Sequence, residues 1–255
     1  MKVLVIYPHG IGDCILLTPA LRSFHELTGE KCSVATLERF KSAQYFDHCP
    51  YIEQVYYTKD AWHDFENVHI GFQTLYDNWK VFAKDNGYKG VVMPMHNSPE
   101  SKILINARTL GIKNFDSPQT DIFTTPKDRE IADKLITDIV GSEEFGFVQT
   151  AAGHDVKDLP ADFGRDWLLK NRNLKNIIEI GREIDPYAHN INVQFEILRR
   201  ASAVCLPDSV FYHACHAMNK PVDFVYFARG ASVYDRVRPL HAVSENVVFD
   251  LEGIK

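Results

Sequence analysis

The sequence HGIGD, near the start of the chain, combines two glycines with a carboxylate. Gly10 and Gly12 let the backbone approach a ligand closely, and a helix that begins there offers free N–H groups to an anion. Asp13 would repel a phosphate held in such a turn. The residue types therefore leave three roles open for Asp13: a general base, a metal ligand or a helix cap.

A second group of reactive side chains lies in the sequence PDSVFYH, where a predicted strand meets a predicted helix. Asp208 and Ser209 can cap that helix, whose first N–H groups would then hold a diphosphate. His213 lies one turn further along the helix, on a face that can be directed toward the same ligand. It is either a ligand contact or a hydrogen-bonded core histidine. His216 follows three residues later, but a metal pair there has no third ligand in view, so we expect no metal site.

Two more histidines follow predicted strands, at the edge of the sheet where ligands bind in open α/β folds. His9 comes after the strand at 3–6, and His96 comes after the strand at 90–95. Each can bind a ligand or hydrogen-bond its own turn, and the sequence favours neither. Arginines follow the last predicted strand at positions 229, 236 and 238, where one can reach a phosphate or all can be exposed.

Alternating strands and helices must position these residues. The run at 3–6 is short, apolar and rich in β-branched residues, which is typical of a buried parallel strand. A helix is expected from Ile15, with Thr18-Pro19 in an early turn. Further strands are predicted at 31–36, 52–57, 90–95, 147–150, 176–180, 203–206 and 222–227, and helices at 39–46, 72–84, 100–110, 127–140, 167–171, 193–201 and 211–218. This alternation predicts an α/β fold with parallel sheets.

The chain carries two such series of strands and helices, divided near residues 140–146. Each series is long enough to form a compact lobe. We therefore expect two Rossmann-like lobes, formed by residues 1–140 and 141–255. The cleft between two lobes is the usual place for a ligand.

Composition and charge disfavour several classes of protein. The 255 residues carry a formal net charge of −6, which does not suit a protein that coats nucleic acid, although a local basic groove can still bind it. The five cysteines form no CxxC pair, which argues for a reducing compartment and against structural zinc. No apolar run approaches the ~20 residues of a membrane span, and only Lys2 precedes the short run at 3–6. We therefore expect no signal peptide, no integral membrane segment and a cytoplasmic location.

Two regions of the chain resemble one enzyme family. The opening KVLVIYPHGIGDCILLTPALRSF is similar to the start of the family 9 glycosyltransferases, the ADP-heptose:lipopolysaccharide heptosyltransferase group. Residues 195–227 resemble that family's donor-site signature, in which a strand leads to Asp-Ser/Thr-Gly-x-x-His and then to Gly-Lys-Pro. The matching residues are Asp208, Ser209, His213, Lys220 and Pro221, while Val210 and Asn219 replace the two glycines. The sequence KDLP at 157–160 resembles the family's Lys-x-Trp-Pro element, with leucine in place of the aromatic residue.

The resemblance implies a GT-B fold and the inverting transfer of a sugar from a nucleotide-diphosphate donor to a hydroxyl group. Residues 1–140 then form the acceptor side and residues 141–255 the donor side. Asp13 resembles the base that takes the proton from the acceptor hydroxyl, and His9 and His96 become acceptor-side candidates. The implied donor contacts are Gly10, Gly12, Lys157 as the cation on the diphosphate, Glu183 as an acid on the ribose, Asp208, Ser209 and His213. The chain is shorter than the usual heptosyltransferase, mainly between residues 181 and 195.

The residue chemistry agrees with this reaction. Glycosyl transfer needs a base on the acceptor side and positive charge on the leaving diphosphate. Lysine and helix N-termini can supply that charge without a metal. Because no DxD-like motif lies in a convincing place, we expect no metal or other cofactor beyond the nucleotide-sugar donor.

Several functions stay open at this point. The acceptor can be a surface glycan or lipopolysaccharide core, a small molecule, or a hydroxylated base in DNA of the kind that some phages carry. One alternative is a sugar-nucleotide epimerase of GT-B shape, which needs further carboxylates in the cleft. Another is a non-catalytic nucleotide-binding subunit, which would keep the donor-side residues and could discard Asp13.

Overall fold

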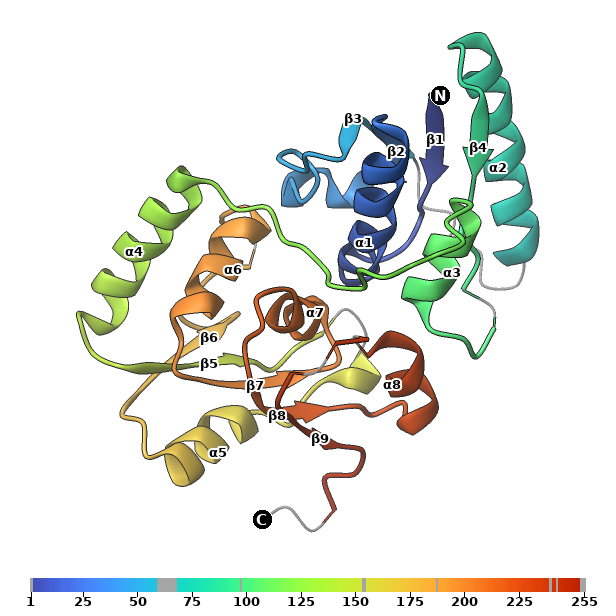
Figure 1. Ribbon diagram of the computed structural model, residues 1–255. Helices are drawn as coiled ribbons and strands as arrows, with labels where there is room; N and C mark the ends of the chain where they lie inside the picture. Colours follow the sequence, from blue (N-terminus) through green and yellow to red (C-terminus); the bar gives the residue numbers. More distant parts are fainter. Residues whose placement is uncertain are drawn as a thin grey trace.

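The computed structural model describes residues 2–58, 68–96, 98–152, 155–186, 188–238, 240–241 and 243–252, with the backbone alone at 68–70 and 155. This part of the chain forms two parallel sheets with helices around them, which confirms the expected α/β fold (Figure 1). None of the helices within the described ranges is long and apolar enough to cross a membrane.

The first sheet has four parallel strands in the order β3-β2-β1-β4. They are β1 (Val3–Ile6), β2 (Cys32–Leu37), β3 (Ile52–Thr58) and β4 (Gly90–Val92). Every residue of β1 is buried, because this strand lies between two neighbours and is covered on both faces. The helices of this half are α1 (Ile11–Thr28), α2 (Val68–Asp85) and α3 (Lys102–Thr109). A 3₁₀ helix, η1 (Glu38–Ala43), replaces the α-helix expected at 39–46.

The second sheet has five parallel strands in the order β6-β5-β7-β8-β9. They are β5 (Phe145–Gln149), β6 (Asn176–Ile180), β7 (Ala203–Pro207), β8 (Val222–Tyr226) and β9 (Glu245–Val248). The helices are α4 (Pro126–Val140), α5 (Phe163–Arg172), α6 (Ile191–Arg200), α7 (Val210–Ala217) and α8 (Ala231–Val237), with a 3₁₀ turn, η2 (Asp155–Lys157). Figure 1 shows α5 on the opposite face of the sheet from α6 and α7. The sequence did not predict α8 and β9.

Helix α1 begins at Ile11, and Pro19 lies inside it. A proline there cannot donate a hydrogen bond to the carbonyl of Ile15, one turn earlier. The Thr18 hydroxyl donates to that carbonyl at 2.7 Å instead, and it accepts from the backbone N–H of Asp121 at 2.8 Å. The expectation that Thr18-Pro19 lies in an early turn was therefore wrong, because the helix begins at Ile11 and not at Ile15. The interior proline is tolerated because the buried threonine satisfies the carbonyl that proline leaves unpaired.

Packed helices join the two sheets. Helix α1 packs against α7, and one apolar cluster runs through both halves of the described molecule, from Val3 to Val237. Helix α4, which ends at Val140, lies beside α6 of the second sheet (Figure 1). The division of the chain into lobes at residues 140 and 141 stays a prediction.

Candidate active site

The turn that holds Gly10, Gly12 and Asp13 meets the turn that holds Asp208 and Ser209 where α1 packs against α7. A Cβ atom added to Gly12 would lie 2.7 Å from Cδ2 of His213 and 3.5 Å from Cα of Val210. Gly12 therefore allows the first turns of α1 and α7 to touch. A Cβ atom on Gly10 would meet nothing within 4 Å. The contacts that both glycines were expected to make with a donor stay predictions.

Asp13 lies in the first turn of α1 and pairs with Lys102 at the start of α3, with 2.5 Å between its Oδ1 and the lysine Nζ. It does not cap the helix, because Gly10 is the N-cap residue and no side chain makes a cap hydrogen bond. Burial raises the pKa of Asp13, but the Lys102 ammonium and two nearby histidines lower it by more, so the pKa lies well below its usual value. The carboxylate is ionised at neutral pH, and the roles of base and metal ligand remain.

The two nearby histidines are His9 and His96, whose rings stack with 4.4 Å between their centroids. Nε2 of His9 donates to the carbonyl of Pro94 at 3.1 Å, and Nε2 of His96 donates to Oδ1 of Asn106 at 2.9 Å. Burial lowers the pKa of both imidazoles, that of His96 to about 3, so both rings are neutral at pH 7. The structure thus gathers His9, Asp13, His96 and Lys102 into one group, which we call the Asp13 cluster.

Asn106 of α3 fixes this cluster from inside the core. Its side chain is fully buried, and Nδ2 donates to the carbonyl of Leu16 at 2.9 Å and to the hydroxyl of Tyr7 at 3.2 Å. Because a carbonyl can only accept, Oδ1 of Asn106 must be the atom that faces His96. The Tyr7 hydroxyl in turn donates to the backbone carbonyl of Asp13 at 3.0 Å.

A second charged group lies around Asp208, which follows β7. Its Oδ2 accepts from Nζ of Lys157 and from Nη2 of Arg229, each at 2.9 Å. Lys157 also donates to the backbone carbonyl of Asp208 at 3.1 Å. Burial raises the pKa of Asp208, but Lys157 and His213 lower it by more, so the net shift is downward. We call Lys157, Asp208 and Arg229 the Asp208 cluster. It contains two residues that the sequence analysis expected to contact the donor, Lys157 and Asp208, and one of the arginines for which the sequence left the role open.

Ser209 and His213 lie at the start of α7. Ser209 occupies the N-cap position, but its hydroxyl donates to Oε1 of Gln149 on β5 and makes no cap hydrogen bond. The expected side-chain cap was wrong, because the hydroxyl is turned toward the sheet. His213 is 6% exposed, and burial lowers its pKa to about 4, while the carboxylates of Asp208 and Asp13 act in the opposite direction. His213 is therefore a neutral, buried ring within electrostatic reach of both clusters.

Glu183 lies just after β6 and is held by the protein itself. Its Oε1 accepts from Arg165 at 2.5 Å, and its Oε2 accepts from the backbone N–H of Glu179 at 2.8 Å. The Thr150 hydroxyl donates to Glu179 Oε1 at 2.5 Å, which continues a row of polar side chains toward β5. Among the described residues, no hydrogen bond or ion pair joins Glu183 to the Asp208 cluster. The ribose contact of Glu183 stays a prediction.

Sequence reasoning missed Lys102 and Asn106. The available signal was a lysine at the start of a helix that follows a predicted strand end. The pairing itself was hidden, because Lys102 and Asp13 lie 89 residues apart in the chain. Arg236, another of the undecided arginines, donates to the backbone carbonyl of His96 and so links α8 to the first lobe.

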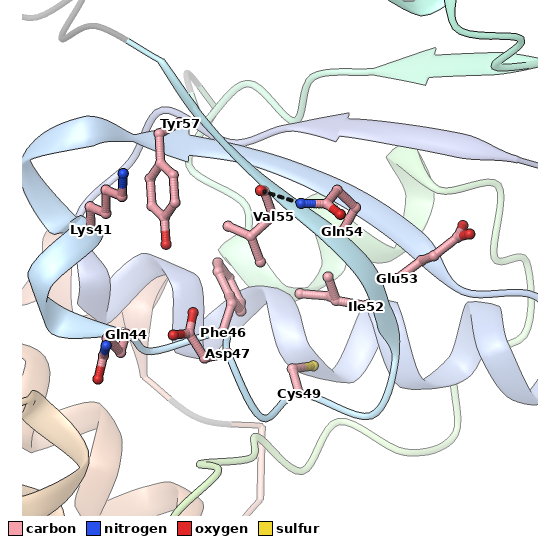
Figure 2. Close-up of a pocket in the computed structure, with 10 residues that line it drawn as sticks. All are labelled: Lys41, Gln44, Phe46, Asp47, Cys49, Ile52, Glu53, Gln54, Val55 and Tyr57. Carbon is pink, nitrogen blue, oxygen red and sulfur yellow. Dashed lines mark hydrogen bonds between the residues drawn. The ribbon is translucent and has the colours of Figure 1, made fainter.

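A cavity of about 480 Å³ lies elsewhere, at the edge of the first sheet between η1 and β3 (Figure 2). Its lining residues are Lys41, Gln44, Phe46, Asp47, Cys49, Ile52, Glu53, Gln54, Val55 and Tyr57. None of them belongs to the Asp13 or Asp208 clusters. The candidate site is therefore located by the convergence of reactive side chains and not by this hollow.

Solved structures of glycosyltransferases share the fold of this chain. A glycosyl transferase family 9 protein from Veillonella parvula superposes with a TM-score of 0.65 at 12% identity, over 96% of this chain and 86% of that chain. The E. coli ADP-heptose lps heptosyltransferase II gives a TM-score of 0.62 at 12% identity, over 97% of this chain and 90% of that chain. The E. coli heptosyltransferase WaaC with ADP gives 0.59 at 15% identity, over 97% and 92%.

At such identities the likeness shows the fold, and this chain has the two-lobed, GT-B-like architecture of those glycosyltransferases. Comparison of the sequence with protein-family models and with curated proteins found no match.

Proposed function

We propose that the chain is a glycosyltransferase that moves a sugar from a nucleotide-diphosphate sugar to an acceptor hydroxyl, with inversion at the anomeric carbon. The observation that carries the proposal is the α1–α7 contact, which brings the first turn holding ionised Asp13 against the turn that follows Asp208. A base on one side and cations on the other are the two requirements of this chemistry. The fold shared with a heptosyltransferase described with ADP supports the same reaction.

On the donor side, Lys157 and Arg229 neutralise the leaving diphosphate. Both cations are held at 2.9 Å from one oxygen of Asp208, so they are ordered before the donor arrives. The first N–H groups of α7 add positive potential at the same place. Ser209 and His213 contact the donor from α7, Glu183 contacts its ribose, and the turn at 10–12 approaches it from the first lobe.

On the acceptor side, Asp13 accepts the proton of the attacking hydroxyl. Lys102 keeps this carboxylate ionised, and a substrate that draws Lys102 away would strengthen the base. His9 and His96 are neutral and contact the acceptor. In this proposal no metal or further cofactor takes part in the transfer. The proposed acceptor is a surface glycan or lipopolysaccharide core, or a hydroxylated DNA base. We also propose that the reaction takes place in the cytoplasm, a reducing compartment in which the five cysteines stay free.

Donor binding is the first test. A thermal-shift panel of nucleoside diphosphates and nucleotide sugars is measured on the wild type, on Lys157→Ala and on Lys134→Ala, which removes an exposed lysine of α4. A ligand that binds the native state raises the melting temperature. We expect a shift with one nucleotide family that Lys157→Ala loses and Lys134→Ala keeps. No shift with any nucleotide would overturn the proposal.

Transfer is the second test. With the donor identified, release of nucleoside diphosphate is followed with glycan, small-molecule and hydroxymethylated-DNA acceptors. Loss of a general base slows a reaction by about 10²–10⁴-fold, so Asp13→Asn should lose transfer while it keeps the donor-dependent thermal shift. Isomerisation of the nucleotide sugar without an acceptor would indicate an epimerase. Donor binding without any turnover would indicate a non-catalytic subunit.

A further inference from the structure

Three metal-ligating side chains converge beside the N-terminus of α1. One ligand atom from each of His9, Asp13 and His96 lies within 4.8 Å of the other two. His9 and Asp13 follow β1, and His96 follows β4, its parallel neighbour in the sheet. The three residues are therefore brought together by the rigid edge of the first sheet and not by a loop alone.

Hydrogen bonds fix the tautomers of both rings. Nε2 of His9 faces the carbonyl of Pro94, which can only accept, so this nitrogen carries the proton. Nε2 of His96 faces Oδ1 of Asn106, whose orientation is set by the carbonyl of Leu16, so it also carries the proton. In both rings Nδ1 is therefore the nitrogen with the lone pair. Metal-binding histidines are commonly held in this way, with the other nitrogen donating to a carbonyl or amide oxygen.

One of these lone pairs has no partner. Nδ1 of His96 is buried and makes no hydrogen bond within the described ranges. Buried polar atoms are nearly always paired, so an orphaned imidazole nitrogen beside a carboxylate and a second imidazole indicates a missing ligand. Asp13 also has an oxygen to offer, because Lys102 is placed on Oδ1.

We propose that His9, Asp13 and His96 bind one divalent transition-metal ion, such as Zn²⁺ or Co²⁺, through the two imidazoles and the carboxylate. Imidazole ligands suit these ions better than Mg²⁺ or Ca²⁺, which prefer oxygen alone. Bonds of about 2.1 Å in a tetrahedral site separate the ligand atoms by about 3.4 Å. The ligand atoms lie within 4.8 Å of one another here, so binding requires them to approach by at most about 1.4 Å. This proposal departs from the expectation of no metal site, because only the fold brings His96 to Asp13.

The bound ion competes with two partners of Asp13. It repels the Lys102 ammonium, and it takes the carboxylate that would accept the proton of the acceptor hydroxyl. Zn²⁺ is therefore an inhibitor of the transfer reaction; this consequence, unlike the binding itself, rests on the proposed function.

Binding is measured on the full chain by calorimetric titration with Zn²⁺ and by the visible absorption of bound Co²⁺. We expect one ion per chain and at least tenfold weaker binding in His96→Gln. The matched control, His48→Gln, removes an exposed histidine and should leave the affinity unchanged. Lys102→Met removes the competing cation and should bind at least tenfold more tightly. Circular dichroism checks that each variant is folded.

Absence of stoichiometric binding, or binding that His96→Gln and Lys102→Met both leave unchanged, would overturn the site. If His96→Gln does not fold, the metal affinity of Lys102→Met alone decides the proposal. Because no substrate is present, these results are independent of the proposed transfer reaction. In a transfer assay, inhibition by Zn²⁺ that a chelator reverses supports the competition, whereas activation by Zn²⁺ would overturn it.

Discussion

Replacing Gly12 by alanine tests the contact between α1 and α7. The new Cβ would lie 2.7 Å from Cδ2 of His213 and 3.3 Å from its Nε2, whereas carbon atoms in good contact lie about 3.5–4.0 Å apart. The ring is 6% exposed and cannot swing into solvent without losing its packing. Overpacking of this kind costs about 1–3 kcal/mol. Without a clash, the same substitution in a helix would stabilise the protein by about 0.5–1 kcal/mol, so the sign of the change is decisive.

The assay is the free energy of unfolding from urea denaturation, with Gly10→Ala as the matched control. Gly10 has a φ of −61°, and its added Cβ meets nothing within 4 Å, so we expect a loss of about 1 kcal/mol at most, from the weaker N-cap. In the double variant Gly12→Ala with His213→Ala, the ring no longer opposes the new Cβ. The double variant should then lose less stability than the sum of the losses in the two single variants. A Gly12→Ala protein as stable as the wild type would refute the close contact.

Three further predictions concern stability measured by urea unfolding. The folded pKa of Asp208 is lowered, so its charge stabilises the protein above about pH 4 and this contribution is lost as the pH falls through the folded pKa. Asp208→Asn should therefore destabilise the protein more at about pH 6 than at about pH 3; an equal loss at both would contradict this. Asn106→Ala leaves the imidazole of His96 and the carbonyl of Leu16 without their hydrogen-bond partner, so it should lower the free energy of unfolding by about 1–3 kcal/mol. The control Asn86→Ala, at an exposed site, should lower it by less than about 0.5 kcal/mol. Thr18→Val removes the hydroxyl that donates to the carbonyl of Ile15, and it should lower the free energy of unfolding by about 1–3 kcal/mol, whereas Thr28→Val at an exposed site should lower it by about 0.5 kcal/mol. Equal losses for Asn106→Ala and Asn86→Ala, or for Thr18→Val and Thr28→Val, would refute the structural role of the buried residue in that pair.

Much of the fold follows from local sequence patterns. The strand at 3–6 was predicted with its observed bounds, because four consecutive apolar residues, mostly β-branched, suit a central strand buried on both faces. The strand at 176–180 was predicted with its observed bounds for a similar reason. The alternation of such runs with helical patterns was enough to predict parallel sheets, and polar residues after strand ends marked the side on which the reactive groups gather.

What the sequence could not supply were pairings between distant segments. The partner of Asp13 lies on α3 and the partner of Ser209 lies on β5, so local sequence could not identify either contact, and the cap expected from Ser209 was wrong. Pro19 was misread because the threonine that compensates for it acts through tertiary packing. Strand β9 was missed because it is an edge strand with no fully buried residue, and such a strand carries a weak apolar signal.

The charges of the two clusters support the division of roles between the lobes. In the Asp208 cluster, two cations share one carboxylate, which leaves a net positive charge that suits a diphosphate. In the Asp13 cluster, one lysine balances one carboxylate beside two neutral imidazoles, which suits an uncharged hydroxyl. The divalent cation that we propose would join the second cluster, which holds the two imidazoles, as Lys102 withdraws from Asp13. In the proposed reaction and the proposed metal site, Lys102 therefore controls both the strength of Asp13 as a base and its availability as a metal ligand.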